Sequence, residues 1–210
     1  MHTVTKIMLV DDHEIVRAGF KRLLDSSDRF SVIAEAATGE EAYQQYQRCM
    51  PDVVVMDLSM PPGAGGLEAI ARIRAVDPNA KILVLTVQEC EPYPSRVMQA
   101  GALGYLTKRC APEELLEAVD CISRGEQFIA PGIREGMNNK EPSRLNQLTK
   151  RELQIFTHLA TGQSAAQIAD TMFISQKTVH AHRANILAKL GLTKTSELIH
   201  LAIRHGVIEA

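Results

Sequence analysis

The sequence has no apolar run approaching the roughly 20 residues that span a bilayer, and no apolar signal segment at its N-terminus. Its four cysteines, Cys49, Cys90, Cys110 and Cys121, form no CxxC pair and no metal-ligand spacing. Internal repeats and low-complexity segments are also absent. These absences argue against a membrane partner and against structural disulfides, and they predict reduced thiols in a cytoplasmic protein.

The net charge of −2 over 210 residues hides an uneven distribution. Acidic residues dominate the first half, while basic residues and histidines gather in the last third (Lys150, Arg151, Lys177, His180, His182, Arg183, Lys189 and Lys194). A split of this kind indicates that one half meets an anionic partner such as nucleic acid, although exposed helix faces are charged in any protein.

Five short apolar runs of strand character recur in the first half, at residues 6–10, 31–36, 53–57, 81–86 and 104–108. Segments with helical spacing of apolar residues separate them. Their expected inward positions are Ile15, Phe20, Leu23 and Leu24, then Leu67, Ile70, Ile73 and Val76, then Leu115, Leu116, Val119 and Ile122. This alternation predicts an α/β fold with a parallel sheet covered on both faces.

Polar residues follow the strands in order: Asp11 and Asp12, then Asp57, Thr86 and Lys108. In open α/β sheets the functional crevice lies beyond the carboxyl ends of the strands, so we expect these side chains to converge. Crowded carboxylates that stay ionised bind a hard cation, and Mg²⁺ takes oxygen ligands. The sequence therefore predicts a Mg²⁺ site built partly from the two adjacent aspartates.

With Mg²⁺ in place, Asp57 would attack a phosphoryl group and form an aspartyl phosphate. Lys108 and the Thr86 hydroxyl would contact the other phosphoryl oxygens. Taken singly, Asp12 could be a helix N-cap and Lys108 a solvated lysine. Asp57 is harder to explain in this way, because an acid is a poor choice for a buried strand end.

The segments "LVDDHEIVRAGF", "VVVMDLSMP", "ILVLT" and "GYLTKRCAPEEL" resemble the receiver domain of bacterial two-component response regulators, over residues 4–124. The resemblance implies a flavodoxin- and CheY-like domain with a five-stranded parallel sheet. It also implies that Asp57 is the phosphoacceptor, that a sensor histidine kinase is the donor, and that Asp11, Asp12, Asp57 and the Ser59 carbonyl hold Mg²⁺.

In that family the residues at Thr86 and Tyr105 change orientation on phosphorylation, although Tyr105 is equally well explained by packing. Two departures from the family stand out. The loop 60–70, "MPPGAGGLEAI", is one residue longer and rich in Gly and Pro, which predicts a mobile lid beside the phosphoacceptor. Pro92 and Pro94 stand where the fourth helix begins, so this helix is expected to start late and be short.

A linker is expected at residues 125–146, because the segment 134–147 has no apolar periodicity and contains Gly, Asn, Pro and Ser. The following domain, 147–210, is helical in pattern. Thr149 and Glu152 form a capping box, Ser164 precedes a helix at 165–172, and Ser175 precedes another that ends at residue 190. Two helices joined by so short a turn indicate a helix-turn-helix.

On the second of these helices we expect Val179, His182, Ile186 and Leu190 to face inward, with His182 as a core histidine. The residues left for contacts to DNA are Lys177, Thr178, His180, Ala181, Arg183 and Ala184. A recognition helix places N-terminal residues against base edges, with Lys and Arg on phosphates, and alanine can contact a thymine methyl.

The segments "LTKRE", "KTVHAHRANILAKLG" and "SELIHLAIRHGVI" resemble the LuxR-type output domain of NarL/FixJ response regulators. That resemblance implies that the last helix, 195–205, pairs two output domains on DNA, although its apolar residues could equally be core. Within the group, "KRCAPEEL" and "KTVHAHRAN" are most similar to the regulator of hexose-phosphate uptake.

The sequence thus predicts a DNA-binding transcriptional regulator rather than an enzyme. Mg²⁺-dependent phosphorylation of Asp57 would favour a homodimer on promoter DNA, with RNA polymerase as a further partner. The main alternative is a receiver regulated without phosphorylation by a ligand or partner. A phosphohydrolase of the haloacid-dehalogenase type is a second alternative, but it needs a second aspartate where this chain has Ser59.

Overall fold

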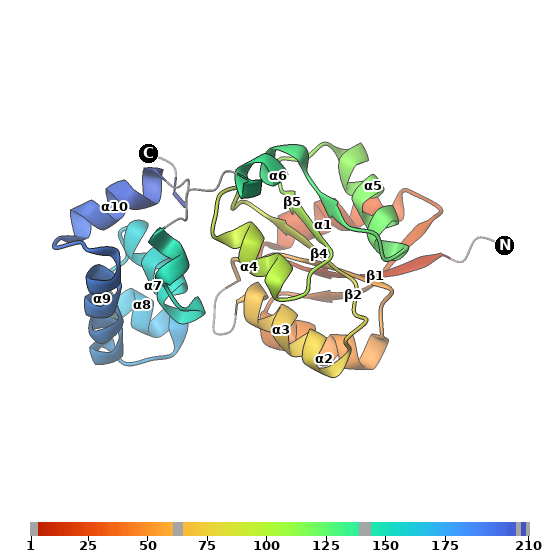
Figure 1. Cartoon of the computed structure of the whole chain (residues 1–210). Helices are drawn as coiled ribbons and strands as arrows, with labels where there is room; N and C mark the ends of the chain where they lie inside the picture. The colour runs from red at the N-terminus through yellow and green to blue at the C-terminus, as the bar shows by residue number, and fades with distance from the viewer. Residues whose placement is uncertain (1–3, 61–64, 139–143, 205–206, 209–210) are drawn as a thin grey trace. The chain divides into compact units, whose positions relative to one another are not determined.

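The computed structural model describes residues 4–60, 65–138, 144–204 and 207–208 (Figure 1). The chain divides into two compact units. The first comprises residues 1–87 and 95–134, and the second comprises residues 88–94 and 135–210. In the part of the chain that is described, no helix is both long enough and apolar enough to cross a membrane.

The first unit is built on a parallel sheet with the strand order β2-β1-β3-β4-β5-β6. The strands are β1 (Thr5–Val10), β2 (Phe30–Ala36), β3 (Val53–Met56), β4 (Ile82–Thr86), β5 (Gly104–Thr107) and β6 (Phe128–Ile129). The first five were predicted. The sixth corrects the expected five-stranded sheet: it has only two residues, too few to give a strand pattern in the sequence.

Helices cover both faces of this sheet (Figure 1). α1 (Glu14–Asp25) and α5 (Pro112–Ser123) lie on one face, and α2 (Gly39–Cys49) and α3 (Gly66–Val76) lie on the other. The core beneath α1 and α5 joins alternate residues of the strands to helix residues; it includes Ile7, Leu9, Leu24, Val53, Val55, Leu83, Leu106, Leu115, Val119 and Ile122. α4 (Tyr93–Gln99) is short, as the two prolines predicted.

Two residues expected to face inward do not. Ile15 is 89% exposed and Val76 is 49% exposed. Ile15 lies in the first turn of α1 and Val76 is the last residue of α3. Both exposed positions lie at helix ends, so apolar spacing alone overestimates the length of the buried face.

The region expected to be an irregular linker contains β6, α6 (Pro131–Asn138) and the 3₁₀ helix η1 (Arg144–Gln147). Ile133 is buried and anchors α6. One buried residue in a short helix is too little for periodicity to reveal. Residues 139–143 of the expected linker, and residues 61–64 of the long loop expected to form a lid, lie outside the described residues.

The second unit is helical, with α7 (Lys150–Ala160), α8 (Ala165–Met172), α9 (Gln176–Leu190) and α10 (Thr195–Arg204). The predicted caps are confirmed. Thr149 and Glu152 form a capping box, Ser164 and Gln167 form a second, and the Ser175 side chain accepts from the Thr178 N–H. Apolar residues from all four helices form one core, including Phe156, Ile168, Val179, Ile186 and Leu198.

Candidate functional site

An acidic cluster lies where the order of the sheet reverses. β1 and β3 are neighbours although β2 lies between them in the chain, and such a switch point opens a crevice at the carboxyl ends of the strands. The Asp57 N–H donates to the Val10 carbonyl over 2.9 Å, which sets the two strand ends side by side. Ligand atoms of Asp11, Asp12, His13 and Asp57 all lie within 4.8 Å of one another.

Lys108 reaches into this cluster from the end of β5. Its Nζ lies 2.6 Å from Asp11 Oδ2 and 2.8 Å from Asp57 Oδ2. Both aspartates are buried, at 3% and 2% exposure. The Lys108 N–H donates to the Thr86 carbonyl over 2.8 Å, so the β4–β5 pairing positions the lysine. Four of the predicted residues are therefore brought together.

The cluster carries an excess of negative charge. Burial raises the pKa of Asp57; Lys108 opposes this shift and the Asp11 charge adds to it. Burial lowers the pKa of Lys108, but Asp57 and Asp11 outweigh burial and raise it, so the lysine stays charged. One ammonium group against three carboxylates leaves charge that a divalent cation would neutralise.

Asp12 supplies a direct test of whether a cation fits. Its Oδ1 atom is buried and accepts no hydrogen bond from the described residues. Buried carboxylate oxygens are rarely left without a partner, and each one is a candidate position for a missing ligand. His13 Nδ1 lies 2.9 Å from this oxygen. The sequence had not singled out His13; its place directly after the two aspartates was the available signal.

Three more predicted residues, Ser59, Thr86 and Tyr105, lie in the first unit. Thr86 and Tyr105 are fully buried, at the end of β4 and within β5. A hydrogen bond from the Ser59 backbone opposes the rise in the Asp57 pKa. Their proposed roles in the switch and as a metal ligand stay predictions.

Gly66 marks a close approach that the sequence did not reveal. Its N–H donates to the Leu58 carbonyl over 3.1 Å. A Cβ atom at Gly66 would lie 2.0 Å from the Asp57 carbonyl oxygen, well inside any van der Waals contact. The start of α3 therefore packs directly against the backbone of Asp57, the predicted phosphoacceptor.

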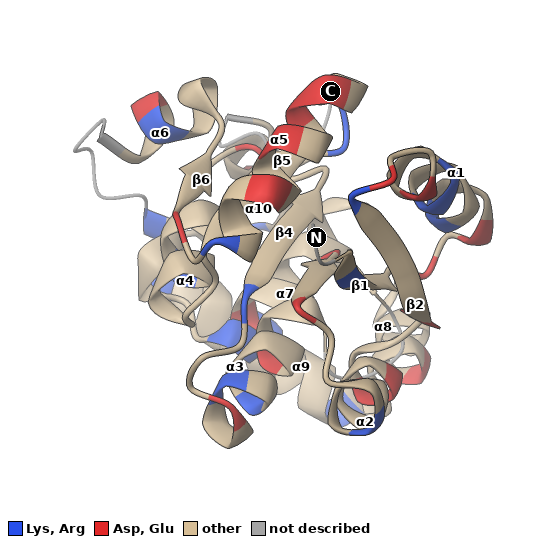
Figure 2. Ribbon diagram, turned by 90° about the vertical axis from the view of Figure 1, so that its right-hand side faces the viewer, with Lys and Arg blue, Asp and Glu red and all other residues tan. Residues whose placement is uncertain are grey.

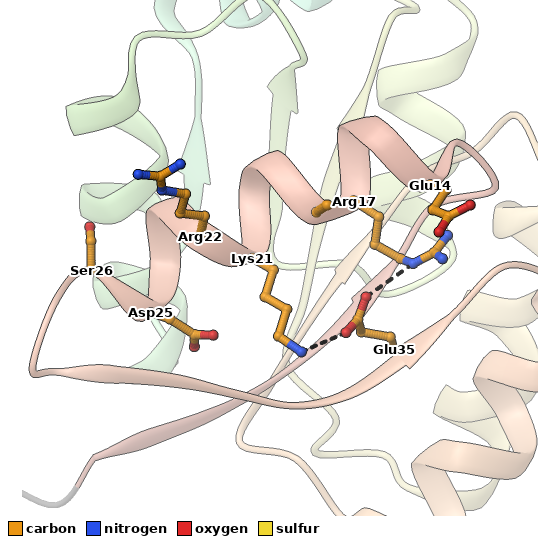
Figure 3. Close-up of a pocket in the computed structure, with 8 residues that line it drawn as sticks. Glu14, Arg17, Lys21, Arg22, Asp25, Ser26 and Glu35 are labelled. Atoms are coloured by element: carbon orange, nitrogen blue, oxygen red, sulfur yellow. Dashed lines mark hydrogen bonds and ion pairs between the residues drawn. The ribbon is translucent and has the colours of Figure 1, made fainter.

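A shallow cavity of about 610 Å³ lies between α1 and β2 and is lined mainly by charged side chains (Figure 3). Arg17 and Lys21 both pair with Glu35, at 3.2 and 2.7 Å. α1 carries residues of both signs along its length (Figure 2). Because the charges largely satisfy one another, we place the chemistry at the strand ends and not in this cavity.

In the second unit, α9 presents the residues predicted to contact DNA. Lys177, His180, Ala181 and Ala184 are exposed, and Thr178 and Arg183 are half-buried. Val179, Ile186 and Leu190 are buried as predicted, and His182 is half-buried. Phe173, in the turn before α9, is 73% exposed and has a φ of 53°.

Comparison with known proteins gives two family matches: the response regulator receiver domain over residues 7–120, and the luxR family of bacterial regulatory proteins over residues 146–202. The response regulator UvrY of Escherichia coli K12 is 41% identical over 210 residues, covering 97% of this chain and 96% of UvrY. These matches identify both compact units.

Solved structures agree. The response regulator ChrA of a heme-sensing two-component system is 33% identical, with a TM-score of 0.56, over 98% of this chain and 99% of that chain. RcsB of Salmonella enterica serovar Typhimurium, solved on a promoter with the phosphomimetic BeF₃⁻, shares the fold at 24% identity. Its TM-score is 0.72, over 95% of this chain and 98% of that chain.

Proposed function

Because the chain belongs to the NarL/FixJ family of response regulators, DNA-binding regulators of transcription rather than enzymes, we propose that phosphorylation of Asp57 switches it on. A sensor histidine kinase is the donor and Mg²⁺ is required. Phosphorylation favours a homodimer that binds promoter DNA. The observation that carries this proposal is the buried Asp57 carboxylate held between Lys108 and the Asp11–Asp12 pair.

The local geometry suits phosphoryl transfer. Asp57 Oδ1 accepts a hydrogen bond from the Leu58 N–H at 2.7 Å, and Oδ2 meets Lys108. A carboxylate oxygen attacks phosphorus, the new O–P bond forms, and the N–P bond to the kinase histidine breaks. Asp11, Asp12, Asp57 and the Ser59 carbonyl would hold Mg²⁺, which supplies charge neutralisation when bound. Lys108 contacts a phosphoryl oxygen after leaving Asp57.

Phosphorylation then changes the orientation of two buried side chains, Thr86 and Tyr105. The Thr86 hydroxyl turns toward the phosphoryl group, and Tyr105 moves into space that Thr86 leaves. Both side chains are fully enclosed before phosphorylation, so neither can turn without displacing its neighbours. This is the two-state element that phosphorylation biases.

In the output unit, α10 supports pairing of two copies. Leu198, Leu201 and Ala202 are buried in the core, whereas Ile203 is 37% exposed and Ile199 is half-buried. The helix therefore has an inner apolar face and additional apolar residues outside it; His205, at the end of the expected helix, lies outside the described residues. DNA contacts come from Lys177, Thr178, His180, Ala181, Arg183 and Ala184.

A regulator that reads promoter DNA works in the cytoplasm, with RNA polymerase as a further partner. The competing function keeps the DNA-binding unit and replaces phosphate by a ligand or protein at the receiver. Pro92, Pro94 and the long loop after Asp57 favour that alternative. The intact acidic cluster favours phosphorylation. The similarity to hexose-phosphate regulators stays a prediction.

The test compares wild type, Asp57→Ala and Asp28→Ala, an exposed acid outside the cluster. Each is treated with Mg²⁺, with or without acetyl phosphate. Phosphate-affinity gels report modification, sedimentation reports mass, and binding to a duplex selected from a random pool reports DNA affinity. We expect the wild type and Asp28→Ala to gain label, mass and affinity, and Asp57→Ala to gain none. Equal DNA binding by all three without labelling would instead support the phosphate-independent alternative.

A further inference from the structure

His13 occupies the N-cap position of α1, yet its side chain caps nothing. Helices favour Ser, Thr, Asp or Asn there, because a side-chain oxygen accepts a hydrogen bond from the first turn. The His13 backbone N–H donates to Asp11 Oδ1 over 2.9 Å, which orients that carboxylate. The imidazole is therefore available for another role.

That imidazole faces the acidic cluster. Nδ1 lies 2.9 Å from Asp12 Oδ1 and 3.3 Å from Asp11 Oδ1. Because Asp12 Oδ1 accepts no hydrogen bond, the shorter contact is not an aligned N–H···O interaction. One nitrogen and three carboxylate oxygens thus gather within 4.8 Å. Ligands about 2.1 Å from one ion lie roughly 3 to 4 Å apart, so little movement would bring them onto a common cation.

The turn that carries these residues is already held in place. Arg17 Nη1 donates to the Asp11 carbonyl oxygen over 2.6 Å, and Arg17 Nε donates to Glu35 Oε2 on β2 over 3.2 Å. Figure 3 shows Arg17 reaching from α1 to Glu35. The β1–α1 turn is therefore bonded to both α1 and β2, and the ligand atoms of Asp11, Asp12 and His13 are held on that turn before a cation binds.

We propose that His13 Nδ1 is an additional ligand of the divalent cation held by Asp11, Asp12 and Asp57, and that it makes the site prefer a transition-metal ion such as Co²⁺ to Mg²⁺. This inference rests on the proposed function, which supplies the cation site itself. Mg²⁺ selects oxygen ligands and gains little from a nitrogen, whereas imidazole is a favourable ligand for the later first-row ions. His13 thus determines which ion binds.

The experiment measures metal binding directly in the full chain, with any polyhistidine tag removed. Wild type, His13→Gln, Asp12→Asn and His200→Gln are titrated with Co²⁺ and with Mg²⁺ by calorimetry. His200 is an exposed histidine of α10 and serves as the matched control. Pulsed EPR of bound Mn²⁺ then reports whether a nitrogen nucleus is coordinated. Circular dichroism confirms that each variant is folded.

We expect wild type and His200→Gln to bind Co²⁺ more tightly than Mg²⁺ and to show nitrogen coupling to Mn²⁺. His13→Gln should lose the coupling and at least about tenfold in Co²⁺ affinity, since even an outer-shell partner is worth that much. Its Mg²⁺ affinity should stay within about twofold, because oxygen ligands dominate there. Asp12→Asn should weaken both ions.

Other results separate the two proposals. If Asp12→Asn weakens both ions while His13→Gln leaves Co²⁺ affinity and nitrogen coupling unchanged, the cation site stands and the role of His13 is refuted. If His13→Gln strengthens binding of both ions, the imidazole opposes the metal instead of holding it, and the inference is wrong. If wild type binds no divalent ion, the Mg²⁺ requirement of the proposed function fails as well.

Discussion

Lys189 Nζ lies 2.6 Å from Glu152 Oε2, which joins the predicted recognition helix α9 to α7. The same carboxylate accepts a hydrogen bond from the Thr149 N–H at 2.7 Å. Burial raises the pKa of Glu152, but Lys189 and Thr149 outweigh burial and lower it. The buried Glu152 carboxylate therefore takes part in the N-terminal cap of α7 and also binds Lys189 near the end of α9.

We expect Glu152→Gln to destabilise the output unit by about 2 kcal/mol, because the amide keeps an acceptor for Thr149 but loses the charge opposite Lys189. Urea unfolding followed by circular dichroism measures this. Glu197→Gln is the control, since Glu197 accepts from the N–H groups of Thr193 and Lys194 at the start of its own helix. An equal loss of unfolding free energy in both variants would mean that the Glu152–Lys189 ion pair between α7 and α9 contributes nothing to stability.

The contact at Gly66 predicts a large effect from one methyl group. Gly66→Ala would place a Cβ 2.0 Å from the Asp57 carbonyl oxygen, so α3 or the end of β3 must move. We expect loss of phosphorylation and a stability decrease of about 1 to 3 kcal/mol. The matched change Gly19→Ala, within α1 and with nothing within 4 Å, should stabilise by about 0.5 to 1 kcal/mol.

Thermal unfolding and phosphate-affinity gels distinguish these two glycines. The proposed need for glycine at position 66 is wrong if both alanine variants are phosphorylated as fully as wild type and have similar stability. It is also wrong if Gly19→Ala is the more damaging of the two.

Lys108 neutralises the Asp11 and Asp57 carboxylates that are also proposed to hold Mg²⁺, so its removal should change how much the ion stabilises the folded chain. Removing it leaves Asp11 and Asp57 buried without their ammonium partner, which typically costs about 3 kcal/mol or more. We expect Lys108→Met to be strongly destabilised without Mg²⁺ and to gain more from saturating Mg²⁺ than wild type does. The ion neutralises the same oxygens and no longer competes with the lysine.

Thermal shifts with and without Mg²⁺ test this, with Lys21→Met as the control. Lys21 forms an ion pair with Glu35 at the surface, and exposed pairs contribute at most about 1 kcal/mol. If Mg²⁺ stabilises wild type and Lys108→Met equally, the lysine and the cation do not share ligands.

Much of the receiver site follows from local sequence. A strand end is marked by the acid or hydroxyl that ends an apolar run, and parallel pairing brings such ends to one edge. Asp11, Asp57 and Lys108 could therefore be placed together from the sequence alone. The caps at Thr149, Ser164 and Ser175 were also predictable, because capping depends on residues within one turn.

The remaining features depend on side-chain direction or on distant parts of the chain. Glu152 and Lys189 are 37 positions apart, so no local pattern pairs them. The direction of the His13 imidazole depends on the turn that Arg17 and Glu35 hold. The exposure of Ile15 goes with its place in the first turn of α1. Tertiary packing decides each of these, and residue type alone does not.

His158 makes the output unit sensitive to acid. Burial lowers the pKa of this imidazole below its ordinary value of 6.5; the Gln163 side chain opposes this shift, and the nearby charge of Arg151 adds to it. At a pH between the folded and the unfolded pKa values, the His158 imidazole is therefore protonated in the unfolded chain and neutral in the folded chain. The stability contribution is fully present above about pH 6.5 and is lost as pH falls through that value toward the lower folded pKa.

We expect urea unfolding of the wild type to show lower stability at pH 5.5 than at pH 7.5, and His158→Gln to show a smaller difference over that interval. NMR titration of the imidazole in the intact chain measures the pKa directly. A His158 pKa above its ordinary value of 6.5 would reverse the sign of the linkage, because protonation would then favour the folded state, and the acid sensitivity would have to come from other groups.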